Sequence, residues 1–418
     1  MRNKLLKWIL LFVLLGVLTL TAHSGTAKNK LAESPIVIPP PAFEVEPMRS
    51  DPQRPVRSSG RSYDGPLFDT HAHLYPPRGR NKAAAVIDKG ELKEIIRVMK
   101  KLGVEHVIFM PTPNDGIRPH QRLGVVKRKL IKDLDPKRVM VFCGSNYITT
   151  WLNSAYHNRY KEEELQNVLT HLSNDLDSGE FAGVGEIATY HFDKGFKRQH
   201  VLKYPPNFEP FLQIVDLIAK KGMWLDLHAE PIDPNGKSYE KEVFGGLELL
   251  FRRNPDLKLL YSHTAMSNSK NVRRILQTYP NVMMSIKIET RHDRWRNLEP
   301  VVNTQGEVYK DWAQLFEEMP ERFMIGADFH FGRKGVKLKK YEKKIKGFRQ
   351  MLAALNPQAA QLIAFENAQK IFYLSESTTT RKAGGLDFTA TGGKRQEREA
   401  PQSLRVEAGA SHPIWETQ

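Results

Sequence analysis

Eight short runs of apolar, often β-branched residues recur between residues 67 and 328, and this recurrence restricts the possible folds more than any other feature. A run that is apolar at nearly every position suits a strand that is buried on both faces, as in a parallel sheet covered by helices. The runs are Leu67–His71, Val104–Met110, Val139–Gly144, Ala182–Ile187, Met223–His228, Leu257–His263, Val282–Ile288 and Phe323–Asp328. We therefore predict a strand for each run.

The segments between these runs have the spacing of helices. In the first segment, apolar residues stand at i, i+3, i+4, i+7 and i+10, and Gly103 ends the pattern. Those residues are Leu92, Ile95, Ile96, Met99 and Leu102. A second such segment extends from Pro210 to Gly222. Alternating strands and helices predict an α/β fold, a closed (β/α)8 TIM barrel; an open doubly wound sheet has the same alternation and is the alternative.

Residues 1–27 have the pattern of a secretory signal peptide. A basic start that contains Arg2 and Lys7 precedes the apolar run Trp8–Leu20, and small residues follow it. Because this run is shorter than the roughly 20 residues of a membrane-spanning helix, we predict cleavage, with a mature chain that begins near His23 or Gly25. The predicted localisation is the periplasm or the exterior, and an uncleaved N-terminal membrane anchor is the alternative.

The rest of the chain divides into three regions by composition. Residues 28–66 are rich in proline and predict a linker, an extended arm on the surface of the barrel. Residues 67–374 hold the strand–helix units and predict the barrel domain. Residues 375–418 contain glycine pairs and isolated charges without apolar periodicity, which predicts a disordered tail.

The charge balance favours anionic neighbours, since 63 basic and 47 acidic residues give a formal charge of +16. The lysine-rich segment Lys337–Lys346 has apolar residues at helical spacing, so we interpret its lysines as the solvated outer face of a helix and expect no specific nucleic-acid partner. The single cysteine, Cys143, excludes an intramolecular disulfide, and its apolar surroundings predict a buried, unreactive thiol.

Side chains that bind metal ions stand at the C-terminal ends of five runs. They are His71, His73, Glu186, His228, His263 and Asp328. In a parallel barrel these ends open onto one face, and residues two apart on a strand point to the same side, so both histidines of the first run can reach one ion. Imidazoles with a carboxylate suit zinc first, and iron, manganese or cobalt next. The sequence predicts a site for one or two divalent metal ions.

The order of these ligands resembles the amidohydrolase superfamily, in particular its amidohydrolase-2 branch, from about Leu67 to Leu374. The ending Phe365–Phe372 is similar to the closing helix of that superfamily. The resemblance implies a TIM barrel and an enzyme, a metal-dependent hydrolase. It also implies that one metal suffices in the branch that includes the aminocarboxymuconate-semialdehyde decarboxylases.

The resemblance also implies a role for each candidate. His71, His73 and Asp328 match the ligands of a first metal site, and His228 matches a further ligand. His263 matches either a second-site ligand or an electrophile. Glu186 stands where TatD-like nucleases place a bridging carboxylate, although an ion pair with a nearby lysine or arginine is the simpler explanation. We interpret Asp69 and Asp226 as packing partners of the ligands and three further histidines as structural residues. These are His191, His292 and His330.

The predicted chemistry is the activation of water for attack on an ester, lactone or amide. A bound divalent ion lowers the pKa of its water towards about 7. Asp328 would accept the proton and pass it to the leaving group, and His263 would polarise the substrate oxygen if it is not itself a ligand. Decarboxylation, TatD-like phosphodiester hydrolysis and a barrel that binds without turnover are the alternatives.

Residues that follow the strand ends are predicted to shape a pocket for a small-molecule substrate. Three of them, Arg78, Lys287 and Arg291, favour an anionic substrate because guanidinium and ammonium groups pair with carboxylate or phosphate. The full predicted set is Tyr75, Arg78, Asn114, Asn146, Trp151, Tyr190, Lys287 and Arg291.

Overall fold

The computed structural model describes residues 55–56, 62–74, 89–113, 137–192, 202–233, 235–288, 300–332 and 337–374. The predicted signal peptide, residues 1–27, and the predicted tail, residues 375–418, lie outside these residues, as does most of the predicted linker. Among the described residues, no helix is long and apolar enough to cross a membrane.

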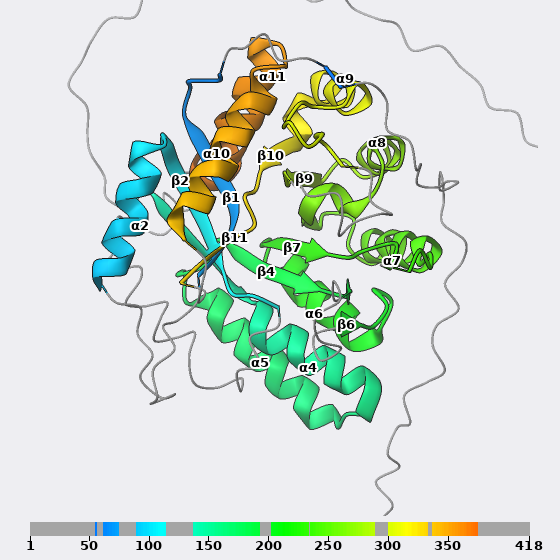
Figure 1. Ribbon diagram of the computed structural model, residues 1–418. Coiled ribbons are helices and arrows are strands. Elements are labelled where there is room, and N and C mark those ends of the chain that lie inside the picture. The colour runs from blue at the N-terminus through cyan, green and yellow to red at the C-terminus, as the bar shows by residue number, and fades with distance from the viewer. Residues whose placement is uncertain are drawn as a thin grey trace, which may run out of the picture. The chain divides into compact units, whose positions relative to one another are not determined.

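A parallel sheet forms the centre of the fold (Figure 1). Hydrogen bonds join its strands in the order β10-β9-β8-β7-β4-β3-β2-β1-β11, and every pair is parallel. The strands are β1 (Leu67–Leu74), β2 (Val104–Met110), β3 (Val139–Gly144), β4 (Gly183–Ala188), β7 (Trp224–His228), β8 (Lys258–Tyr261), β9 (Val282–Ile286), β10 (Phe323–Ile325) and β11 (Phe329–Phe331). Each of the eight predicted runs therefore contributes a strand.

The barrel closes through β10, which the eighth run forms, and through β11, which directly follows that run. β10 pairs with β9, whereas β11 pairs with β1. The connecting residues hold both neighbours, because Gly326 N donates to Ile286 O at 2.9 Å and Asp328 N donates to His71 O at 2.7 Å. The last strand thus joins the first, which confirms the (β/α)8 barrel and excludes the open sheet.

Helices surround the sheet on its outer side (Figure 1). Both helices that the apolar spacing predicts are present, α2 and α6, and the glycines that follow them, Gly103 and Gly222, have φ of 67° and 64°. A residue without a Cβ adopts this left-handed conformation at low cost, so each glycine ends its helix. The outer helices are α2 (Lys89–Lys101), α4 (Ser145–Asn158), α5 (Glu162–Asp177), α6 (Glu209–Lys220), α7 (Glu240–Arg253), α8 (Ser269–Thr278), α9 (Lys310–Glu318) and α10 (Leu338–Leu352).

The last helical turns of the described residues close the end of the barrel where the strands begin. They comprise α11 (Pro357–Gln361) and α12 (Asn367–Gln369) with helical turns between and after them. The ring of Phe372 lies 6.1 Å from that of Phe68, 5.9 Å from Phe142 and 5.8 Å from Trp224. These apolar contacts bury the inward-facing side chains of the strand starts. The predicted metal ligands lie at the opposite end, where the strands finish.

α10 confirms the interpretation of the lysine-rich segment. Tyr341, Ile345 and Phe348 are buried against the barrel, while Lys339 and Lys343 are exposed. Cys143 is buried, as predicted. A part of the predicted linker lies against the same helix, since Arg349 Nη1 donates to Tyr63 O at 2.7 Å and to Gly65 O at 2.9 Å.

Candidate metal centre

All six predicted ligands lie at the C-terminal end of the barrel, and Glu186 stands among them. Glu186 Oε1 is 2.7 Å from His228 Nδ1 and 3.4 Å from His263 Nε2. Its other oxygen, Oε2, is 3.4 Å from His73 Nε2 and 3.7 Å from His71 Nε2. The four imidazoles and Glu186 are all buried. One carboxylate thus contacts imidazole nitrogens from β1, β7 and the turn after β8. These partners of Glu186 are histidines, and not the lysine or arginine of the simpler explanation.

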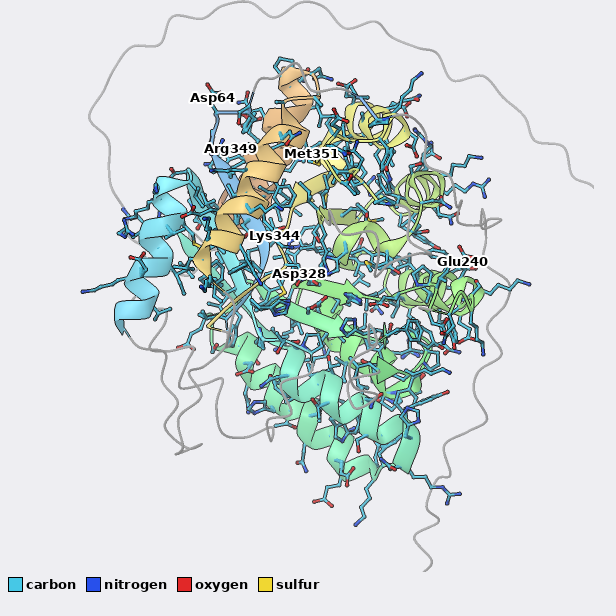
Figure 2. All side chains as sticks on the ribbon, in the orientation of Figure 1. Asp64, Glu240, Asp328, Lys344, Arg349 and Met351 are labelled. Atoms are coloured by element: carbon cyan, nitrogen blue, oxygen red, sulfur yellow. The ribbon has the colours of Figure 1, made fainter. Side chains whose placement is uncertain are left out.

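Asp328 lies beside this group, in the break between β10 and β11 (Figure 2). Its Oδ1 is 3.2 Å from His73 Nε2, and its Oδ2 is 3.8 Å from His263 Nε2. Oδ2 also forms an ion pair with Lys287 Nζ, and Oδ1 is 3.5 Å from His330 Nε2. Asp328 has a φ of 46°, which turns the chain out of the strand direction at this residue.

The backbone that presents His263 differs from the prediction. The sequence predicts a strand up to His263, but β8 ends at Tyr261 and a left-handed turn within Ser262–Met266 follows. All residues from His263 to Met266 have positive φ, between 49° and 59°. Ser285 Oγ accepts a hydrogen bond from His263 N at 3.1 Å. With the backbone in this left-handed turn, His263 Nε2 lies 3.4 Å from Glu186 Oε1.

Two glycines allow the strands to approach one another beneath the site. A Cβ on Gly185 would lie 2.5 Å from Asp226 Cβ, and a Cβ on Gly326 would lie 2.8 Å from His71 Cβ. Contacts this short do not occur between real side chains, so any larger residue would displace the neighbouring strand. His71 is a candidate ligand, and Asp226 contacts its ring. A side chain at either glycine would therefore shift His71 or Asp226 from its present position.

Protein acceptors hold the second nitrogen of both β1 histidines. His71 Nδ1 lies 3.1 Å from Asp226 Oδ2, and His73 Nδ1 lies 3.2 Å from Pro111 O. A proton on each Nδ1 leaves Nε2 with its lone pair directed at the site. Asp69 supports the backbone instead, since it accepts from Ala327 N at 2.8 Å. Asp226 therefore contacts the ring of a candidate ligand and Asp69 contacts backbone, and among the described residues neither belongs to a group that could hold an ion.

Sequence reasoning missed one buried acid, and two of the histidines that it interpreted as structural lie next to candidate residues. Glu230 lies 3.0 Å from His228 Nε2, and His191 Nδ1 lies 2.8 Å from Glu230. His330 lies beside Asp328 and stacks on His73 with ring centroids 4.7 Å apart. Glu230 and His330 each follow a predicted ligand by two residues, so the period of a strand was the available signal.

Among the predicted pocket residues, Lys287 is the one that contacts a candidate ligand within the described chain. Tyr190 is buried and donates to Glu242, Asn146 is buried in α4, and Trp151 is half-buried in that helix. The remaining four predictions lie outside the described residues. They are Tyr75, Arg78, Asn114 and Arg291, and the same holds for His292.

The ionisation of the site follows from its charges. Burial alone would lower the pKa of His73, but hydrogen bonds to Asp328 and Glu186 raise it to about 9. Burial would also lower the pKa of His228, but the neighbouring carboxylates of Glu186 and Glu230 raise it to about 9. Without a metal, imidazolium protons thus compensate the carboxylates, and an ion that binds here has to displace them.

His263 and Asp328 have the opposite shifts. Burial and then the charge of Lys287 hold the pKa of His263 well below its usual value. Burial would raise the pKa of Asp328, but Lys287 and a hydrogen bond from His73 hold that pKa well below its usual value. At neutral pH the site therefore contains a neutral imidazole beside an ionised carboxylate, the forms in which both residues coordinate a cation.

The donor set fits a divalent metal ion. His71 Nε2 is buried without a hydrogen-bond partner and lies among acceptor and donor atoms of the other candidates. Five groups among the described residues could hold an ion, and they overlap. They are His71–His263–Asp328, His71–His73–Glu186, Glu186–His228–His263, His73–Asp328–His330 and His191–His228–Glu230. Nitrogen and carboxylate oxygen in this proportion suit zinc, iron, manganese or cobalt better than calcium or magnesium. Ligation by each residue stays a prediction.

Comparison with known proteins gives distant similarities. No family model and no curated protein matches the chain. A putative metal-dependent hydrolase from Lactobacillus casei is 12% identical with a TM-score of 0.46, covering 75% of this chain and 97% of that chain. IDCase of Metarhizium anisopliae is 13% identical with a TM-score of 0.45, covering 75% and 98%. A 2,6-dihydroxybenzoate decarboxylase is 12% identical with a TM-score of 0.43, covering 74% and 99%. Similarities this distant leave the activity to be argued from the chain's own residues.

The chain's own fold and site carry the amidohydrolase resemblance. The barrel is closed, and the strand-end residues that the resemblance singled out meet at one end of it. In both respects the chain resembles that superfamily, as its sequence predicted.

Proposed function

We propose that this protein is a metal-dependent hydrolase that activates water for attack on an ester, lactone or amide. The observation that carries the proposal is the position of Glu186, whose two oxygens face four buried imidazoles while Asp328 stands beside them. A cluster of this kind concentrates cation ligands around an ionised acid that is able to accept a proton.

Each candidate residue has a separate role in the proposed reaction. His71, His73, His228 and Asp328 would hold the metal, with Glu186 and His263 as further ligands, and zinc is the ion that the donor set favours. When bound, a divalent ion lowers the pKa of water and polarises the substrate oxygen. Asp328 would accept the proton of the attacking water and return it to the leaving group. Lys287, which pairs with Asp328 Oδ2, keeps Asp328 ionised.

Lys287 also supports an anionic small molecule as the substrate. Its side chain is 11% exposed, and its charge is balanced by Asp328. Once Asp328 shares its negative charge with a metal ion, less of that charge offsets the positive charge of the largely buried Lys287 ammonium. A carboxylate on the substrate restores the balance, and a lysine ammonium is a suitable partner for it.

The proposed activity is tested with purified protein that has been loaded with Zn²⁺. We expect one or two equivalents of bound metal by elemental analysis and hydrolysis of at least one member of a panel of carboxylated lactones, esters and amides. Release of carbon dioxide from carboxylated aromatic rings without hydrolysis would replace the proposal by decarboxylation. Cleavage of phosphodiesters alone would favour the nuclease alternative, and the absence of bound metal would refute the proposal altogether.

We also propose that the protein is exported to the periplasm or the exterior. The support is the charged start, apolar middle and small-residue zone of residues 1–27. N-terminal sequencing of the protein from its native host is expected to begin near His23 or Gly25. An intact Met1 in the membrane fraction would favour the anchor, and an intact Met1 in the soluble cytoplasmic fraction would contradict export.

A further inference from the structure

Glu230 is a buried carboxylate behind one of the candidate ligands. It lies two residues after β7, and 2% of its surface is exposed. Its Oε1 is 3.0 Å from His228 Nε2 and 2.8 Å from His191 Nδ1, and its Oε2 accepts from Phe192 N at 3.2 Å. Three donors offset the cost of burying the charge. These three contacts of Glu230 are with two imidazoles and one backbone N–H, and not with a lysine or an arginine.

The imidazole of His228 is consequently held between two carboxylates. Its Nδ1 is 2.7 Å from Glu186 Oε1, on the side where His263 also points, and its Nε2 faces Glu230. A histidine that binds a metal uses one nitrogen and keeps a proton on the other. In the proposed site the ion lies on the Nδ1 side, with Glu186, so the proton belongs on Nε2, which is also 3.1 Å from His191 Nδ1.

We propose that Glu230 is a positioning residue for His228. Its Oε1 accepts a hydrogen bond from Nε2–H, which sets the plane of the ring and reserves the Nδ1 lone pair for the ion. Asp226 stands in the same relation to His71, and the Pro111 carbonyl to His73. Acceptors of this kind orient a metal-binding ring and raise its basicity. The inference rests on the proposed metal-dependent function and adds a residue to it.

The same carboxylate also anchors the short hairpin that follows β4. This hairpin pairs β5 (Tyr190–His191) with β6 (Leu202–Lys203), and Glu230 holds it through His191 and Phe192. A second anchor is available for comparison, because Tyr190 donates to Glu242 on α7. Glu242 is exposed, and it contacts Tyr190 of the hairpin and not a candidate ligand. Replacing Glu242 therefore loosens the hairpin while His228 keeps its acceptor.

The test compares Glu230→Ala, Glu230→Gln and the matched control Glu242→Ala in the full-length protein. The dissociation constant for Co²⁺ is measured by competition with a coloured chelator. We expect Glu230→Ala to bind Co²⁺ about 10- to 100-fold more weakly than the wild type, as loss of such acceptors does elsewhere. Glu230→Gln should weaken binding less, because its amide oxygen still accepts a hydrogen bond, and Glu242→Ala should match the wild type.

A spectroscopic measurement separates positioning from general support of the fold. In Zn²⁺-loaded protein with ¹⁵N-labelled histidine, the Nε2–H of His228 should be protected from exchange in the wild type and in Glu242→Ala. It should lose that protection in Glu230→Ala.

Several results would overturn the inference. They are wild-type Co²⁺ affinity in Glu230→Ala, equal weakening in Glu242→Ala, and the loss of one whole equivalent of Co²⁺, which would make Glu230 a ligand. If Glu230→Ala does not fold, wild-type affinity and an unchanged His228 signal in Glu230→Gln would overturn it. A wild-type protein that binds no Co²⁺ would overturn the proposed function as well, whereas binding that is indifferent to Glu230 overturns this inference alone.

Discussion

Replacement of both His71 and His73 by alanine is expected to remove the bound metal and to abolish turnover while the barrel stays folded. The two rings are buried, and their Nε2 atoms lie 3.7 and 3.4 Å from the same oxygen of Glu186. Without them the cluster loses half of its imidazoles, and fewer nitrogen ligands remain for the ion. The change lies at the functional end of the barrel, away from the aromatic packing that closes the other end. Elemental analysis and circular dichroism measure the two outcomes separately.

His171→Ala is the matched control for this double replacement. His171 lies on the outer helix α5, where its side chain is 46% exposed and its partner is Asp175. This variant should keep the metal content and the turnover of the wild type. Survival of both in the His71→Ala, His73→Ala protein would show that the ion, if there is one, lies elsewhere.

The candidate site was predictable where it follows from strand geometry. Residues at the ends of parallel strands meet at one end of a barrel, and the period of two places His71 and His73 on one side. The same period applied to the later ligands indicates His330, two residues after Asp328, and Glu230, two residues after His228. Those two residues were therefore within reach of the argument that found the first pair.

Other parts of the site depend on backbone conformations that the residue types conceal. The left-handed turn from His263 to Met266 contains no glycine, asparagine or aspartate, so composition gives no sign of it. The break at Gly326–Asp328 interrupts a run that is otherwise apolar, and Gly326 is its one indication. Both departures place a side chain at the site: His263 in the first case and Asp328 in the second.

The ionisation of the site was also beyond the sequence, because it depends on distances across the barrel. Lys287 follows β9, yet it pairs with Asp328 after β10. From the sequence we expected Lys287 to contact substrate. The structure adds that this ammonium lowers the pKa values of both His263 and Asp328.

Asp328→Asn is expected to lower kcat by about 10²-fold or more, because the amide cannot accept a proton from the attacking water. The amide keeps an oxygen close to where Oδ1 faces His73, so part of the metal should remain bound. Metal content measured on the same sample separates loss of the proton acceptor from loss of the ion. Asp216→Asn is the control, since Asp216 lies on α6 and pairs with Arg253, and its kcat should not change. A wild-type kcat in Asp328→Asn would remove Asp328 from the proton transfer and leave that task to Glu186, the other carboxylate that faces the imidazoles.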